Sequence, residues 1–141
     1  MTFAVLDRAF DGADPVVPAA RSHRGRMAYH AGLAAEDVIA RHFRGLGHRI
    51  AAQRWRGHRG EIDLIVEDGD GLIFVEVKQS RDFDTALSHV TPAQVRRLYA
   101  TGEEYLGTRV DGSLTDVRFD VALVDGGGAV RILENAFGHV F

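Results

Sequence analysis

The first hydrophobic pattern in the chain predicts a helix over about residues 28–44. Apolar residues recur there every three or four positions, which is the spacing of an amphipathic helix. They are Leu33, Ala34, Val38, Ile39, Ala40 and Phe43. Gly45 and Gly47 follow this stripe, and glycine there favours the end of a helix.

The next three predicted elements are β-strands, which cover residues 48–55, 60–67 and 72–78. In the last two, apolar and polar residues alternate with a period of two, so each strand has one apolar face. Ile62, Leu64 and Val66 are therefore expected to share a face.

A second helix and two more strands complete the predicted order. Thr91 followed by Pro92 is typical of a helix start, with threonine as the N-cap, and this helix is expected to end near Leu106. Further strands are predicted at 117–124 and 129–133. The order helix, three strands, helix, two strands predicts an α/β fold with a mixed five-stranded sheet flanked by helices.

The length of 141 residues suits one globular domain and excludes a multi-domain protein. Residues 1–26 have neither helical nor strand periodicity, so we expect a disordered N-terminal extension, with the single domain at 27–141. Met27 lies at this boundary and is an alternative translation start. N-terminal sequencing of the native protein distinguishes Met27 from Met1 as the start.

The composition narrows the function classes. The chain has no cysteine, which excludes disulfide frameworks, thiolate zinc sites and cysteine nucleophiles. No run approaches the roughly 18 consecutive apolar residues of a membrane-spanning helix, and the first residues lack the order of a signal peptide. We therefore expect a soluble cytoplasmic protein with no membrane partner.

The charge is distributed unevenly along the chain. The total is -3, but residues 21–59 hold nine arginines and two acidic residues, a net +7, which leaves -10 for the rest. Such asymmetry indicates a surface that faces a polyanion, and we expect nucleic-acid contacts from Arg41, Arg44, Arg54 and Arg56. A solvated arginine-rich surface is the alternative, because the chain has sixteen arginines and one lysine.

The turn at residues 68–71 determines which polar residues meet between the second and third strands. A four-residue hairpin loop there places Asp63 opposite Glu76 and Glu61 opposite Lys78, on one face of the sheet. Opposed like charges destabilise a sheet, and a hard divalent cation such as Mg²⁺ or Mn²⁺ removes the repulsion. Asp63 and Glu76 are therefore candidate metal ligands.

Lys78 and Glu36 extend this candidate site. Lys78 is the only lysine of an arginine-rich chain, and its compact ammonium suits a catalytic role in orienting water or neutralising a reacting phosphate. Glu36 lies on the inward stripe of the first helix, where an unpaired carboxylate is costly. The alternatives are a helix-face pair of Glu36 with Arg41 or His42, and an acidic surface hairpin without metal.

The residues of this hairpin resemble those of known nucleases. The pattern Asp63, twelve residues, then Glu76-Val77-Lys78 resembles the D-x(n)-E-x-K core of the PD-(D/E)xK nuclease superfamily, which includes archaeal Holliday-junction resolvases. Across about residues 28–137 the chain resembles the YraN-like family of small bacterial proteins more closely. The matching positions are Gly32, Glu36 and Ala40, Trp55-Arg56, Gly60-Glu61-Ile62-Asp63-Leu64-Ile65, Phe74-Val75-Glu76-Val77-Lys78, Arg118-Phe119-Asp120-Val121 and Asn135-Ala136-Phe137.

The resemblance implies a restriction-endonuclease-like fold and a division of roles at the site. Glu36, Asp63 and Glu76 match the metal-binding acids of the superfamily, and Lys78 matches its catalytic lysine. Family members usually carry a lysine early in the helix after the hairpin, where this chain has Gln94. Gln94 is therefore either an accessory site residue without the charge or a solvent-facing helix residue.

Together these expectations describe an Mg²⁺- or Mn²⁺-dependent, endonuclease-like hydrolase that acts on DNA, including branched DNA. Many nucleases of that superfamily dimerise to cut two strands, so a homodimer stays open. The alternative function is a module on the same fold that binds nucleic acid or protein without cutting. An assembly factor with vestigial carboxylates is a third.

Overall fold

The computed structural model describes the backbone of residues 19–137 and, apart from Ser113, the side chains of residues 32–137. Most of the expected N-terminal extension, residues 1–18, therefore lies outside the described residues. The elements are α1 (Ala19–Gly45), β1 (Ile50–Arg56), β2 (Glu61–Asp68), β3 (Gly71–Gln79), α2 (Phe83–Ser88), α3 (Pro92–Leu106), the 3-10 turn η1 (Gly112–Leu114), β4 (Val117–Val124) and β5 (Val130–Leu133). The predicted order of helices and strands is confirmed.

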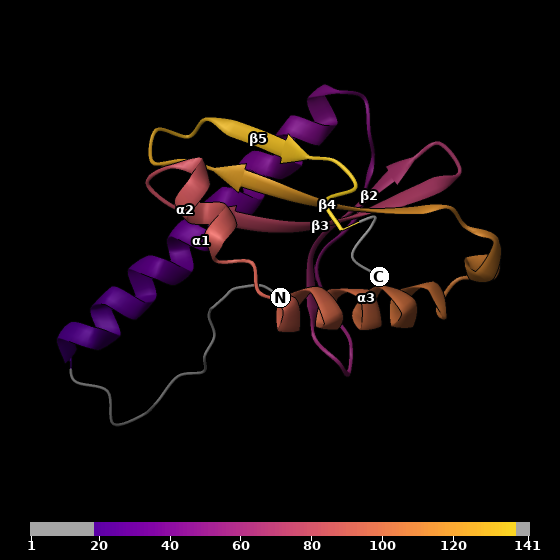
Figure 1. Ribbon diagram of the computed structural model, residues 1–141, viewed down its shortest axis with the longest axis horizontal. Helices are drawn as coiled ribbons and strands as arrows, with labels where there is room; N and C mark the ends of the chain where they lie inside the picture. The colour runs from indigo at the N-terminus through magenta and orange to yellow at the C-terminus, as the bar shows by residue number, and fades with distance from the viewer. Residues whose placement is uncertain (1–18, 138–141) are drawn as a thin grey trace.

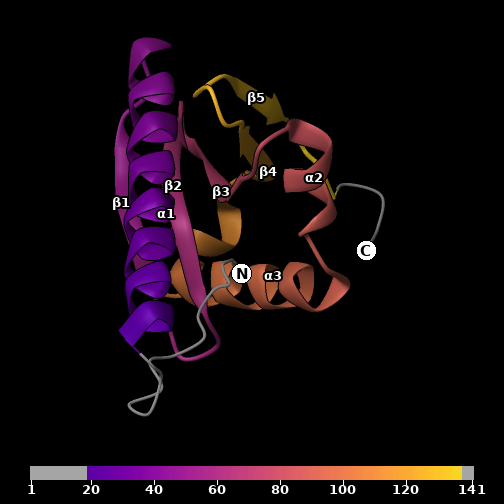
Figure 2. The ribbon, with the colours of Figure 1, turned by 90° about the vertical axis from the view of Figure 1, so that its left-hand side faces the viewer.

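The elements form three layers, with the sheet in the middle. Helix α1 covers one face, while α2 and α3 lie on the other (Figure 1; Figure 2 shows the two sides edge on). One buried cluster joins α1 to the sheet and includes Ile39 and Phe43, and a second cluster joins it to α2 and α3 and includes Ala86 and Leu98. Within residues 19–137, no helix is long and apolar enough to cross a membrane.

The five strands follow one another in the sheet in the order β1-β2-β3-β4-β5. Only β3 and β4 are parallel, and α2 and α3 form the crossover between them. Strand β3 is buried on both faces from Leu72 to Lys78, as expected for the centre of a sheet with helices on both sides. The mixed sheet predicted from the sequence is therefore confirmed, and β3 is its central strand.

The β2–β3 hairpin has the predicted register. Glu67 pairs with Leu72 and Asp68 with Gly71, and the pairing continues to Leu64 and Val75. A turn of this length fixes the register because each residue on one strand can face only one partner on the other. The loop length therefore gave the correct alignment for the adjacent site.

Two helix predictions need correction. Helix α1 begins at Ala19, whereas residue 28 was predicted, so residues 19–26 of the expected extension are helical. They lack an apolar stripe, which was the signal used, although alanine and arginine both favour helix. Helix α2 was not predicted, because six residues are too few to show a helical period; the Asp82 side chain caps it by accepting the N–H of Thr85.

The shared face predicted for Ile62, Leu64 and Val66 is wrong for Ile62. Leu64 and Val66 belong to the cluster under α1, whereas Ile62 belongs to the cluster under α3. A regular strand would place all three on one side. The alternation is therefore interrupted between Ile62 and Leu64, which is the position of Asp63.

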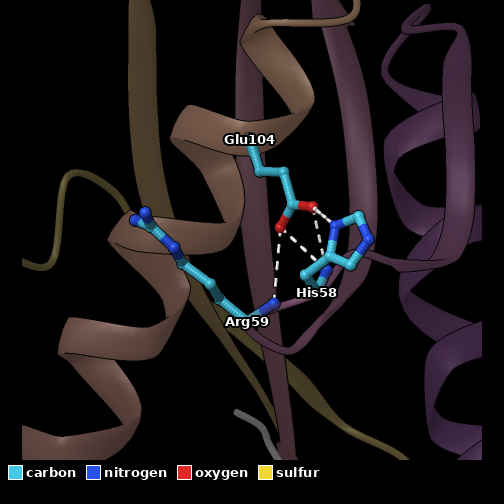
Figure 3. A network of polar contacts seen from close by, with 3 residues as sticks. All are labelled: His58, Arg59 and Glu104. Atoms are coloured by element: carbon cyan, nitrogen blue, oxygen red, sulfur yellow. Dashed lines mark hydrogen bonds and ion pairs between the residues drawn. The ribbon is translucent and has the colours of Figure 1, made fainter.

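Glu104 of α3 holds the turn between β1 and β2 against the helix. Its carboxylate accepts the backbone N–H of His58 at 2.9 Å and of Arg59 at 3.4 Å, and its Oε2 lies 2.6 Å from Nδ1 of His58 (Figure 3). These hydrogen bonds hold the pKa of Glu104 below its usual value. Gly57 begins this turn, and a Cβ there would overlap the Glu104 carboxylate and lie 2.9 Å from Cζ3 of Trp55.

Replacing Gly57 with alanine is therefore expected to destabilise the protein by about 1–3 kcal/mol, the usual cost of overpacking. Part of that cost arises because Glu104 must release the turn, so Gly57→Ala should cost less when Glu104 is already alanine. Urea unfolding of the two single variants and the double variant measures the difference. Strict additivity would contradict the contact, and Gly32→Ala, where a Cβ meets nothing within 4 Å, is the control.

Candidate active site

The candidate site lies where β2 separates from β3. Their paired register ends at Leu64 and Val75, and beyond it the β1–β2 hairpin turns away from β3 and passes α3 (Figures 1 and 2). Asp63 is the first β2 residue past this point. Its Oδ2 accepts the backbone N–H of Val77 at 2.9 Å. The Asp63 side chain thus accepts a hydrogen bond from β3 in place of a backbone carbonyl of β2. This bond holds the buried Asp63 carboxylate beside β3.

Glu76 and Lys78 lie on β3 next to this carboxylate. Both are buried, with 1% and 6% of their surface exposed, and Nζ of Lys78 is 3.2 Å from Oε2 of Glu76. Within the described residues, neither oxygen of Glu76 accepts a well-directed hydrogen bond. The ion pair with Lys78 is therefore its main compensation, and burying a carboxylate with so few partners costs free energy.

Burial raises the pKa of both Asp63 and Glu76. It raises the pKa of Glu76 well above the usual value, and repulsion from Asp63 adds to this while Lys78 opposes it. Burial also raises the pKa of Asp63 to about 6, opposed first by the Val77 hydrogen bond and then by Lys78. Asp63, Glu76 and Lys78 are therefore within electrostatic reach of one another, although the β2–β3 pairing ends at Leu64 and Val75, before the predicted pair of Asp63 with Glu76.

Glu36 joins this group from α1, on the other side of the sheet from α3. It is half-buried, and desolvation followed by repulsion from Asp63 raises its pKa to about 9. Arg54 of β1 lowers that pKa and so lies close to the Glu36 carboxyl. Glu36 is therefore not a surface acid paired with Arg41 or His42 alone, because it interacts with the acid at the centre of the site.

The donor chemistry of this group suits a hard divalent cation. Glu36, Asp63 and Glu76 offer carboxylate oxygens, and the two Glu76 oxygens are buried acceptors whose polar contact is the ion pair of Oε2 with Lys78. No three histidine, aspartate or glutamate side chains in the described part of the chain are arranged so that they already form a metal-binding group. The assignment of these acids as ligands therefore stays a prediction.

Gln94 has a structural role at the start of α3. Its Oε1 accepts the backbone N–H of Thr91, and Thr91 Oγ1 accepts the N–H of Gln94, each at 3.2 Å. This reciprocal pair is a capping box, which stabilises the first turn of α3. The side chain is half-buried, and its accessory role in chemistry stays a prediction.

The four arginines predicted to contact nucleic acid fall into two groups. Arg41 and Arg44 are exposed on α1, and Arg56 is exposed on β1 while its Nη2 lies 3.2 Å from Oε2 of Glu61. Arg54 is half-buried, and its charge lowers the pKa of Glu36. The exposed group suits contact with an extended backbone, whereas Arg54 lies at the site itself.

Two features of the site were missed from the sequence. Glu61 was expected opposite Lys78, but it pairs with Arg56 of β1, because the β2–β3 pairing ends before it. The backbone N–H of Val77 that holds Asp63 gave no signal, since every non-proline residue has this donor.

Comparison with known proteins identifies the family. Residues 35–124 match the model of a family described as "Uncharacterised protein family UPF0102". The chain belongs to UPF0102. Its relatives include a UPF0102 protein of Roseobacter denitrificans, 55% identical over 120 residues, which are 85% of this chain and 93% of the relative. A UPF0102 protein of Ruegeria pomeroyi is 50% identical over 120 residues, 85% of this chain and 98% of the relative.

Membership of UPF0102 confirms the YraN-like resemblance that the motifs indicated. The matched region contains all four residues of the site, from Glu36 on α1 to Lys78 on β3. These family names state no activity. Any function therefore has to be argued from the geometry of the site.

The raised carboxyl pKa values predict how stability depends on pH in the absence of metal. Because the folded protein holds these protons more tightly than the unfolded chain, the stabilisation is complete at low pH and is lost as pH rises. For Glu36 the window runs from 4.5 to about 9, and for Asp63 from 3.8 to about 6.

We therefore expect the free energy of unfolding in EDTA to fall by at least about 1.4 kcal/mol, equivalent to one pKa unit, between about pH 5 and pH 8.5. Urea unfolding across this range measures it. Glu36→Gln should weaken the dependence of stability on pH, since the amide does not titrate. Glu103→Gln, at an exposed position of α3, should leave this dependence unchanged. A stability that rises with pH would contradict the prediction.

Proposed function

We propose that this UPF0102 protein is a hydrolase that uses Mg²⁺ or Mn²⁺ to cut phosphodiester bonds in DNA. The observation that carries the proposal is the Glu76 carboxylate, which is 1% exposed, lacks well-directed hydrogen bonds, pairs with Lys78 at 3.2 Å and is repelled by Asp63. Such a group costs stability, and a fold retains it where its charge is used. A divalent cation and a reacting phosphate are the partners that match this arrangement.

Three acids would hold the metal. Asp63 and Glu76 would be ligands, and Glu36 would complete or orient the shell from α1. The Val77 N–H takes one acceptor site on Oδ2 of Asp63, so Oδ1 and the second lone pair of Oδ2 would be the donors available to a metal. When bound, the ion supplies positive charge that polarises a phosphoryl oxygen and lowers the pKa of a coordinated water.

Lys78 would stabilise the charge that develops on the phosphate. Its ammonium is buried and held near Glu76, so it is already oriented in a site with little water. In the reaction, the oxygen of one water bonds to phosphorus and the ester P–O bond breaks. The leaving oxygen takes a proton, and the products are a phosphate monoester and a hydroxyl group.

The exposed arginines would position the DNA. Arg41 and Arg44 are exposed on α1, and Arg56 on β1 has 76% of its side chain exposed. Arginine contacts with phosphates depend strongly on salt and carry little sequence information. DNA structure, including branches, rather than base sequence would therefore decide what is cut. A homodimer would allow two strands to be cut, and sedimentation of the protein alone tests it.

A binding module without catalysis is the second candidate. It is favoured by the finding that, among residues 32–137, no three acidic or histidine side chains already form a metal-binding group. In that case the three acids would have a structural role only. Calorimetric titration with Mn²⁺ separates the two, because a binding module would show no metal affinity that depends on Asp63 and Glu76.

The test is cleavage of branched, single-stranded and duplex DNA with Mg²⁺ or Mn²⁺ and with EDTA. Wild-type protein should cut at least one substrate only with metal. Glu76→Gln and Lys78→Ala should each lower the rate by about 100-fold or more while DNA binding is retained, because each removes a group that acts on the reacting phosphate. Asp63→Asn should also lower Mn²⁺ affinity.

Glu103→Gln is the matched control, since it removes an exposed carboxylate of α3 that is 81% accessible. Its rate should equal that of the wild type. Cleavage that persists in Glu76→Gln would reject the proposed site, and the absence of metal-dependent cleavage on every substrate would reject the proposed function.

A further inference from the structure

Arg54 has a backbone conformation that its side chain disfavours. Its φ is 54°, in the left-handed region, where a Cβ crowds the backbone. In the described part of the chain, the other residues with positive φ are glycines and Asn135, which adopt this conformation at lower cost. Arg54 is the exception, and residues held in such conformations cluster at active sites.

The strain coincides with an interruption of the sheet. Ala52 pairs with Ile65 and Trp55 with Ile62, and all four pack on the α3 side. Residues three apart in a regular strand lie on opposite faces, so both strands lose their alternation between these two pairs. Gln53 pairs with Leu64 in this interval, which leaves Arg54 and Asp63 as the remaining opposed residues.

The interruption in β2 and the strained residue in β1 are therefore parts of one distortion. Asp63 is turned toward β3, where it accepts the N–H of Val77. Arg54 is half-buried and close to Glu36, which lies on the α1 side. The distortion thus places Arg54 near Glu36 and Asp63 beside β3. Regular strands would not bring these two side chains to the site.

We propose that Arg54 binds the scissile phosphate and is a second cation of the reacting centre besides Lys78, distinct from the exposed arginines that hold the rest of the DNA. The inference rests on the proposed nuclease function and adds a residue role to it. A guanidinium can donate two parallel hydrogen bonds to phosphate oxygens, which a lysine ammonium cannot do in a fixed plane. The proposed reacting centre contains the three acids Glu36, Asp63 and Glu76, so a phosphodiester needs more positive charge there than Lys78 alone supplies.

The experiment compares Arg54→Gly, Arg54→Asn and Arg54→Lys with the wild type, and uses Arg131→Ala as a control. Arg131 is an exposed arginine of β5 that lies over the Phe83 ring. For each protein we would measure the thermal midpoint in EDTA, Mn²⁺ affinity by calorimetry, and cleavage rates below and at saturating DNA.

Arg54→Gly and Arg54→Asn should keep or raise the thermal midpoint, because both residues tolerate positive φ. Their Mn²⁺ affinity should change by less than the about 10-fold loss typical of removing support for a metal ligand. Their cleavage rate at saturating DNA should fall by about 100-fold, the usual effect of losing one donor to a reacting oxyanion. Arg54→Lys should retain more activity than either, and Arg131→Ala should match the wild type.

Three results would overturn the inference. Wild-type rates in a stable Arg54→Gly protein would place Arg54 outside the reaction while leaving the proposed nuclease intact. If Arg54→Gly and Arg54→Asn both lower the thermal midpoint and the Mn²⁺ affinity, Arg54 only balances the charge of the acids and does not bind the phosphate. A wild-type protein without metal-dependent cleavage would instead reject the proposed function and this role with it.

Discussion

The buried carboxylate of Glu76 is the constraint on which the site depends. It lies on the central strand of the sheet, whose neighbouring residues belong to the two hydrophobic clusters. Lys78 offsets part of its charge, yet no well-directed hydrogen bond from a described residue reaches either oxygen. The hydrophobic burial of β3 on both faces supplies the stability that this arrangement consumes. The stability of this hydrophobic core therefore allows the Glu76 carboxylate to remain buried.

The separation of β2 from β3 allows the other acids of the site, Asp63 and Glu36, to come near the Glu76 carboxylate. If the two strands stayed paired, backbone hydrogen bonds would fill the space and Asp63 would point to one face only. Because they separate, the N–H of Val77 is free to fix Asp63, and acids from α1 and from the sheet approach one another. The Glu104 contact with the β1–β2 turn supports this geometry, since it holds the departing hairpin against α3.

Much of this arrangement could be predicted from the sequence because it follows from local rules. Loop length fixed the β2–β3 register, and Thr91 with Pro92 located the start of α3. Long-range effects could not be predicted in this way. The side change of Ile62 and the left-handed Arg54 arise from a distortion shared by two strands, and no residue of either strand is a glycine that would signal it. The start of α1 was placed too late because helix propensity alone, without an apolar face, was not counted.

The formal charge of the site links metal to substrate in the proposed reaction. With Glu36, Asp63 and Glu76 ionised and Lys78 and Arg54 protonated, the group carries one net negative charge, so it would repel a phosphodiester. One divalent cation reverses the sign and makes the same group attractive to a single negative phosphate. Without metal, the raised pKa values favour protonated acids, so protons take over part of the cation's role in limiting repulsion. Protons and the metal ion would thus compete for the same carboxylates, and the bound metal would favour binding of the phosphate. Because these groups are buried, each change in their charge has a large effect on free energy.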